Sequence, residues 1–219
     1  KLMGRASETI RSDYELASLV AKAAAQNQGN EAALVAVVDA TKTIDSDYEM
    51  RRALTATLAQ PVAPKVASSV LTSAGTIASD YERATLLIDL AKRGGLTSAT
   101  KGPYFELVKT IRQSHEQGRV LRSVAAMPNL PEDVLADAVR ASHAISGGYE
   151  GGQFLTQSIA RQPVTSKSAN EVIQAASGIK SDNEQATLLV DLAKRGGVTD
   201  ETAGAFFPLV SAMTQSFEQ

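Results

Sequence analysis

Apolar residues recur along the chain in clusters with helical spacing, and short polar segments separate the clusters. One cluster consists of Leu86, Leu87, Leu90 and Ala91. Its i, i+1, i+4, i+5 spacing is typical of one face of an amphipathic helix. A second kind of cluster, Val37, Val38, Thr41 and Ile44, follows i, i+1, i+4, i+7 and predicts another helix. Because alternating apolar and polar strands are nowhere evident, we expect an all-α protein.

The polar segments carry a short motif, Ile-x-Ser-Asp-Tyr-Glu, that returns at a nearly constant interval. Complete copies begin at Ile10, Ile44 and Ile77, and degenerate copies begin at Ile111, Ile145, Ile179 and Met213. The differences between these positions are 34, 33, 34, 34, 34 and 34. Such regularity predicts a repeat protein. We expect one helical-repeat domain over residues 1–219, with repeats starting near 10, 44, 77, 111, 145 and 179 and partial repeats at 1–9 and 213–219.

Each repeat is expected to contain two helices of about 14 residues. Register positions are counted here from the motif Ile as zero. Helix A follows the motif and buries positions +9, +10, +13 and +14. Helix B precedes the next motif and buries positions −7, −6, −3 and 0, which in the last copy are Phe206, Phe207, Val210 and Met213. One hairpin cannot bury both faces, so the hairpins must stack into an α-α superhelix of about six repeats.

Local chemistry explains why a helix begins at each motif. Ser followed three residues later by Glu is a capping box, in which the Ser hydroxyl accepts from a backbone amide and the Glu carboxylate reaches back to the Ser amide. Complete boxes are Ser12/Glu15, Ser46/Glu49, Ser79/Glu82 and Ser181/Glu184. Some B helices are expected to begin at polar caps, namely Asn30, Thr97, Thr165 and Thr199.

The segment Lys-Arg-Gly-Gly occurs at residues 92–95 and again at 194–197. One interpretation is a phosphate-binding nest of backbone amides. The favoured interpretation is helix termination, with cations in the last turn and a glycine where a left-handed residue is needed. The glycine pairs 147–148 and 151–152 interrupt a helix start and predict a loose or bent unit at the fifth motif.

The repeat resembles a known class once the alternatives are compared. The tetratricopeptide series requires residues that this Trp-free chain lacks, and the ankyrin Thr-Pro-Leu-His is also missing. Ile-x-Ser-Asp-Tyr-Glu followed by Leu-Leu resembles HEAT-like repeats of bacterial extracytoplasmic proteins, such as those attached to membrane metallopeptidases of the beta-lactam-sensor type. The resemblance implies a HEAT-like solenoid and a periplasmic or secreted location, with the cytoplasm as the alternative. It implies no peptidase activity here, because His115 and His143 are 28 residues apart and form no His-Glu-x-x-His helix.

Composition removes several function classes. Cysteine is absent, which excludes disulfides and cysteine-ligated metals. The formal net charge is −2, from 22 Lys+Arg and 24 Asp+Glu, so the chain lacks the basic footprint of a nucleic-acid binder. No stretch approaches the roughly 20 apolar residues of a membrane span. We expect no cofactor and no metal, and we assign no catalytic residue.

Two register columns and one group of arginines are candidate binding features. The motif glutamates at +5 form either a stripe for a cation or basic partner or, as favoured, the capping boxes. Column +4, which holds Tyr14, Tyr48, Tyr81, His115, Tyr149, Asn183 and Phe217, either binds a partner or, as favoured, packs beside the next hairpin. Arg51, Arg52, Arg119 and Arg122 form either a basic patch or, as favoured, a solvated face.

The architecture favours a non-enzymatic scaffold that binds a protein or peptide partner on its long surface. The alternative is the sensory arm of a larger membrane-anchored metallopeptidase. A third hypothesis, a HEAT-like DNA glycosylase, is disfavoured by the net charge. Neither end carries a recognisable polar capping repeat, so we expect a longer array or covered ends, and end-to-end contacts are compatible with this pattern.

Overall fold

A computed structural model of the chain describes residues 2–59, 61–143, 145 and 149–216. These residues form thirteen α-helices and one short 3-10 helix, and no strand occurs among them. The all-α prediction is therefore confirmed, and helices that are neighbours in sequence pack as an α-α superhelical repeat. The chain divides into two compact units, residues 1–112 and 113–219, and each unit is described by itself. The single domain expected over residues 1–219 stays a prediction.

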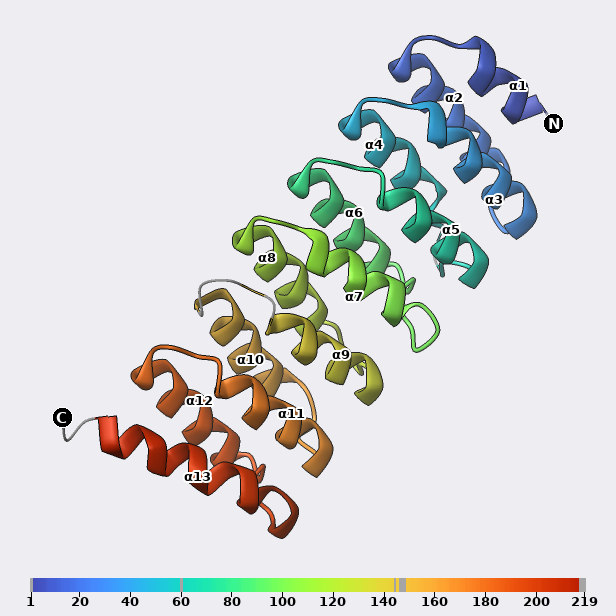
Figure 1. The fold of residues 1–219 in the computed structure, drawn as a ribbon. Helices are drawn as coiled ribbons and strands as arrows, with labels where there is room; N and C mark the ends of the chain where they lie inside the picture. Colours follow the sequence, from blue (N-terminus) through green and yellow to red (C-terminus); the bar gives the residue numbers. More distant parts are fainter. Residues whose placement is uncertain (1, 60, 144, 146–148, 217–219) are drawn as a thin grey trace. The chain divides into compact units, whose positions relative to one another are not determined.

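The first unit contains two layers of helices (Figure 1). The A helices are α2 (Asp13–Gln26), α4 (Asp47–Thr57) and α6 (Asp80–Lys92). The B helices are α1 (Leu2–Thr9), α3 (Glu31–Asp39) with the 3-10 helix η1 (Ala40–Thr43), α5 (Pro64–Ala74) and α7 (Lys101–Thr110). Helix α4 packs between α2 and α6, and α5 packs between α3 and α7. Each hairpin thus stacks on the next within its own layer.

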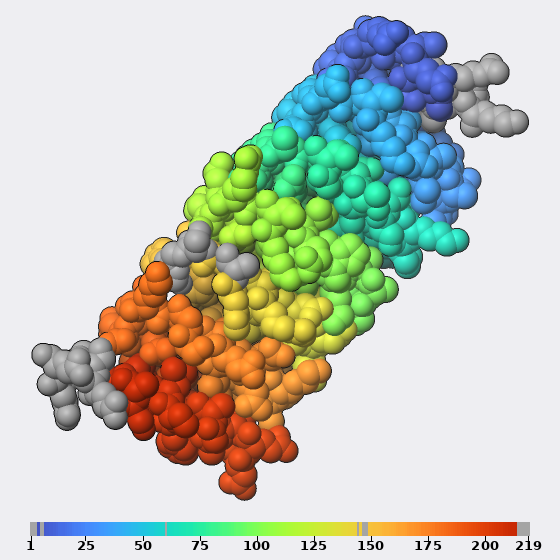
Figure 2. Space-filling view, viewed as in Figure 1, coloured from blue at the N-terminus to red at the C-terminus, as the bar shows by residue number. Residues whose placement is uncertain are grey.

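The second unit repeats this arrangement (Figure 1). Its A helices are α8 (Ser114–Ala125), α10 (Tyr149–Arg161) and α12 (Asp182–Lys194). Its B helices are α9 (Glu132–Ser142), α11 (Ser166–Ala176) and α13 (Asp200–Ser216). Within each unit the space-filling surface consists of bands that follow one another in chain order (Figure 2). Contacts within a unit are therefore made mainly between consecutive hairpins.

The predicted apolar register matches the core in the inner repeats and departs from it in the first and last ones, where Ala193 at +14 is exposed and Val210 at −3 is half-buried. Positions +9, +10, +13 and +14 of the fourth repeat, for example, are fully buried. Phe207 was expected in the same face as Phe206, yet it is 57% exposed. The same −6 position is buried in α5, α9 and α11, each of which is followed by another B helix. Since α13 is the last helix of the described residues, no such helix covers Phe207.

The predicted helix lengths and one cap need correction. Helices α3, α5, α7, α9 and α11 have 9 to 11 residues rather than about 14. Thr97 does not cap α7, because its carbonyl accepts from Thr100 and Lys101 in a separate turn and delays the helix to Lys101. Asn30 and Thr165 do cap their helices, accepting from the amides of Ala33 and Ser168.

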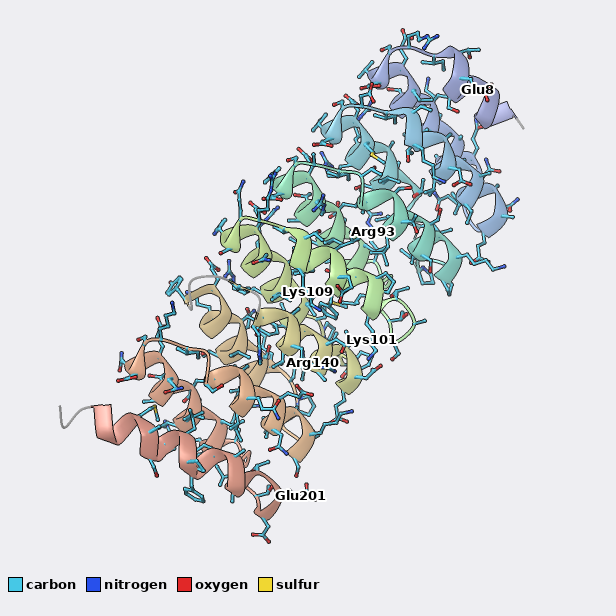
Figure 3. All side chains as sticks on the ribbon, in the orientation of Figure 1. Glu8, Arg93, Lys101, Lys109, Arg140 and Glu201 are labelled. Atoms are coloured by element: carbon cyan, nitrogen blue, oxygen red, sulfur yellow. The ribbon has the colours of Figure 1, made fainter. Side chains whose placement is uncertain are left out.

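The helix-termination interpretation of Lys-Arg-Gly-Gly is confirmed. Gly94 has φ of 82°, a left-handed conformation that favours glycine, and the amide of Gly95 donates to the Leu90 carbonyl at 2.9 Å. The Arg93 guanidinium donates to the Leu58 carbonyl at 2.8 Å, so this cation serves the turn of the preceding hairpin (Figure 3). Of the glycines at the fifth motif, Gly151 and Gly152 are buried in α10, and residues 147 and 148 lie outside the described residues.

Of the two hydrogen bonds predicted for the capping box, the structure confirms only one. Ser12, Ser46, Ser79 and Ser181 each accept from the amide three residues on, at 3.3 to 3.4 Å, as predicted. The reciprocal bond does not go to the motif Glu. The Ser46 amide donates to Asp13 at 2.8 Å, and the Ser79 amide donates to Asp47 at 2.7 Å. The acceptor is thus the aspartate of the preceding repeat, which leaves the motif glutamates free for another role.

Candidate protein-binding face

Three tyrosines stand in a row on the A helices of the first unit. Tyr14, Tyr48 and Tyr81 come from the first turns of α2, α4 and α6, and they are 64%, 53% and 56% exposed. Their common position follows from the repeat, because each lies at +4, directly before the motif Glu. More than half of each residue is in solvent, so these rings are not buried against the next hairpin, although the Tyr14 ring contacts Arg52 of that hairpin. We call these three residues the tyrosine row.

Two arginines of α4 hold part of this row in place. The Arg51 guanidinium lies 5.1 Å from the ring centroid of Tyr48, and that of Arg52 lies 5.1 Å from the ring centroid of Tyr14. Such cation–π contacts are favourable by about 0.5–1 kcal/mol at exposed sites. Arg52 also donates to the Tyr14 carbonyl and to the Ser18 hydroxyl, at 3.2 and 3.1 Å. The arginine side chains thus span neighbouring repeats.

The same arginines form ion pairs with motif glutamates. Arg51 binds Glu82 of the next repeat, and Arg52 binds Glu49 of its own repeat, both with N–O separations of 2.6 Å. These pairs are largely shielded, because the side-chain exposures range from 14% to 31%. The motif Glu therefore serves as an acceptor for an arginine within the chain, a role that neither sequence interpretation included.

The second unit pairs its glutamates in the same manner. Arg119 binds Glu116 of its own repeat at 2.7 Å. Arg122 binds Glu150 of the next repeat, and His115 lies 3.4 Å from the same carboxylate. The hypothesis of a basic patch on the A helices is therefore wrong for these four arginines, because each one is balanced by a glutamate. The description of these arginines as a solvated face is also incomplete, since ion pairs with the glutamates fix the positions of their guanidinium groups.

A pocket lies between α10 and α12 of the second unit. Its volume is about 370 Å³. The lining combines Tyr149 with small and polar side chains and with two ionisable groups, Arg122 and Glu184; the remaining lining residues are Gly152, Gln153, Thr156, Gln157, Ala160, Asn183 and Thr187. Tyr149 and Asn183 occupy the +4 column, so the pocket belongs to the same helical face that carries the tyrosine row in the first unit.

Other candidate chemistry is sparse in the part of the chain that the structure describes. His115 is exposed in α8 and His143 is exposed in the turn after α9, and no group of three or more metal-ligating side chains comes together among the described residues. None of the described helices combines the length and apolar character that crossing a bilayer requires. Of the column members, Phe217 and the seventh motif Glu, Glu218, lie outside the described residues.

Comparison with protein-family models, with curated proteins and with solved structures finds no match for this chain. The resemblance to repeats attached to beta-lactam-sensor metallopeptidases stays a prediction that rests on the motif. The expected extracytoplasmic location stays one as well.

Proposed function

We propose that the chain is a non-enzymatic interaction module that binds a partner protein or peptide on the exposed face of its A helices. The observation that carries this proposal is the tyrosine row: three large side chains, each more than half exposed, on successive A helices. Tyrosine and arginine are enriched among the residues that dominate binding energy at protein interfaces. The tyrosine row presents three such side chains, and two arginines of α4 lie beside it.

Preorganisation supports the same proposal. A tyrosine ring has only two side-chain torsions, so ordering it on binding costs little entropy. Tyr14 and Tyr48 are already contacted by guanidinium groups whose ion pairs with Glu49 and Glu82 fix them in turn. A partner that covers the row therefore meets side chains that are partly ordered before binding, which improves affinity.

The alternative, a sensory arm of a membrane-anchored metallopeptidase, has its support in the motif resemblance alone. Such an arm would also act through protein contacts, so the tyrosine row would serve it equally. The absence of nucleic-acid binding is a further prediction, supported by the net charge of −2 and by the internal pairing of the A-helix arginines.

The test compares two triple variants of the chain for capture of partners from extracts of the source cell. Y14S/Y48S/Y81S removes the tyrosine row, and K65S/T72S/E106S changes three exposed residues of the B helices α5 and α7. For a partner purified from the wild-type capture, the first variant should weaken binding by about 30-fold or more, as expected for loss of a hot spot. The second variant should change the affinity for this partner by less than about threefold. Equal losses in both variants, or none in either, would reject the tyrosine row as the binding face.

A further inference from the structure

Glu184 is a motif glutamate without an arginine. Four of its equivalents, Glu49, Glu82, Glu116 and Glu150, pair with arginines. Within the described residues no basic side chain pairs with Glu184, and its main-chain amide donates to the Ser181 hydroxyl at 3.4 Å. Its carboxylate nevertheless lies at a defined place, with Oε2 3.7 Å from the point where a Cβ on Gly152 would stand.

The repeat register explains why the arginine is missing. The pairing arginines occupy three positions relative to the motif: +8 of the same repeat, as in Arg52 and Arg119, and +7 or +11 of the preceding repeat, as in Arg51 and Arg122. Around Glu184 these three positions hold Thr187, Gly152 and Thr156. All three of these small residues line the 370 Å³ pocket. Each paired glutamate has an arginine at one of these positions, so the pocket is the space that such an arginine side chain would occupy.

The preceding repeat shows the same arrangement filled. There Gly118 is the equivalent of Gly152, Arg122 of Thr156 and Glu150 of Glu184, each at an offset of 34 residues. A Cβ on Gly118 would stand only 2.3 Å from the Glu150 carboxylate and 2.9 Å from Arg122 Nη1. Glycine is therefore needed there to admit the ion pair. Gly152 leaves equivalent room beside Glu184, but the Thr156 side chain is too short to reach the Glu184 carboxylate as Arg122 reaches that of Glu150.

We infer that the pocket between α10 and α12 binds the side chain of an arginine supplied by a partner protein or peptide. This inference rests on the proposed function and names the chemistry that the face recognises. The incoming guanidinium pairs with Glu184 and lies against the ring of Tyr149, as Arg52 pairs with Glu49 and lies over Tyr14. Pairing of this kind is charge-assisted and directional. The same interaction that joins repeats within the chain thereby joins the chain to its partner.

Charge and shape favour arginine over other occupants. Arg122 also lines the pocket, but Glu150 balances it, so Glu184 leaves the site with an excess negative charge. A metal ion needs several oxygen ligands, and Glu184 is the only carboxylate among the lining residues. Lysine is a compact, strongly hydrated charge, whereas the planar guanidinium stacks on an aromatic ring and donates from a fixed fork. The tyrosine beside the carboxylate therefore selects the guanidinium.

The experiment titrates ¹⁵N-labelled full chain with Nα-acetyl-L-arginine methylamide and follows amide chemical shifts. The citrulline derivative is the uncharged isostere, and the lysine derivative is the alternative cation. Three variants are compared with the wild type: E184Q removes the charge, T156R supplies the arginine in cis, and E15Q changes an exposed motif glutamate of α2 that has no such pocket. The amide spectrum of each variant also reports whether it is folded.

We expect saturable shifts at Gly152, Gln153 and Thr187 with a dissociation constant on the order of millimolar. E184Q should weaken binding at least about fivefold, T156R should abolish it, and E15Q should leave it unchanged. The citrulline derivative should not bind, and the lysine derivative should bind more weakly than arginine. Shifts that persist in both E184Q and T156R, equal binding of citrulline, or no saturable shift with arginine would each overturn the inference. These outcomes are separate from the proposed function, because the tyrosine-row variants test a partner at the first unit.

Discussion

The Asp47 carboxylate accepts a hydrogen bond from the main-chain amide of Ser79, 32 residues further along the chain, at 2.7 Å. A second bond, from the Ala78 amide, is 3.1 Å long. Asp13 binds the Ser46 amide in the same way, and Asp80 accepts from the Arg112 amide at 3.2 Å. The aspartate of the motif therefore ties each motif turn of the first unit to the next one.

Replacing this aspartate should destabilise the first unit. In D47A the amides of Ala78 and Ser79 lose a charged acceptor, which is expected to cost about 1–3 kcal/mol. Asp45 lies in the same motif turn and is exposed, so D45A is the matched control and should change stability by less than about 0.5 kcal/mol. Urea unfolding followed by circular dichroism measures both. Equal free energies of unfolding for the two variants would contradict the inter-repeat role.

The ion pairs of the motif glutamates should be worth more than ordinary surface pairs. Arg51 and Glu82 have side-chain exposures of 19% and 14%, whereas Lys42 and Asp39 of the exposed control pair have 55% and 53%. A double-mutant cycle with R51M and E82Q should give a coupling energy of about 1–2 kcal/mol. The cycle with K42M and D39N should give less than about 0.5 kcal/mol. Similar values for the two cycles would mean that the shielding of the first pair has no energetic effect.

Tyr104 should make the stability of the first unit sensitive to alkaline pH. Its hydroxyl donates to the Leu87 carbonyl at 3.1 Å, and burial raises its pKa well above the ordinary value. The unfolded chain releases this proton near pH 10, whereas the folded chain retains it, so the stabilisation is complete below about pH 10 and is lost as the pH rises further. The free energy of unfolding should be about 1 kcal/mol lower at pH 11 than at pH 9, and this difference should be smaller in Y104F. An identical fall in Y104F would contradict this assignment.

Two glycine-to-alanine variants in the same region should differ in their effect on stability. A Cβ on Gly95 would stand 2.3 Å from Leu90 Cδ1, and Leu90 is fully buried. G95A is therefore expected to cost about 1–3 kcal/mol by overpacking. Beyond the local backbone of α7, no atom lies within 4 Å of a Cβ on Gly102, so G102A should leave stability unchanged or raise it by up to about 1 kcal/mol. Thermal unfolding of both proteins checks this, and a destabilised G102A would count against the packing argument.

The fold could be predicted from the sequence because helical spacing and burial are governed by the same register. Leu86, Leu87 and Leu90 lie at core positions in the sequence pattern and are fully buried in the structure. Phe207 departs from this rule because burial at −6 depends on a following helix. The position of a residue in the repeat register does not tell whether a following helix is there to cover it.

The chemistry of the motif could be predicted only in part. A capping box explains Ser and Glu within four residues, so the local pattern looked complete. The actual partners lie on neighbouring repeats: Ser79 binds Asp47, and Glu82 binds Arg51. The arginines at +7 and +11 lie 31 and 28 residues from the glutamates that they bind, so these pairs can be recognised only once the hairpins are stacked. The missing arginine beside Glu184 could be recognised only once the arginines beside the other motif glutamates had been located in the structure.

Site-specific photo-crosslinking in the source cell tests most directly whether the A-helix face binds a partner. The photoreactive amino acid p-benzoylphenylalanine replaces Tyr48 or Tyr81 on the A helices and, in separate variants, Thr72 or Glu106 on the B helices; all four positions are exposed. The account predicts a discrete crosslinked protein from positions 48 and 81 and not from 72 and 106. Crosslinks of equal yield from both faces, or from the B helices alone, would contradict it.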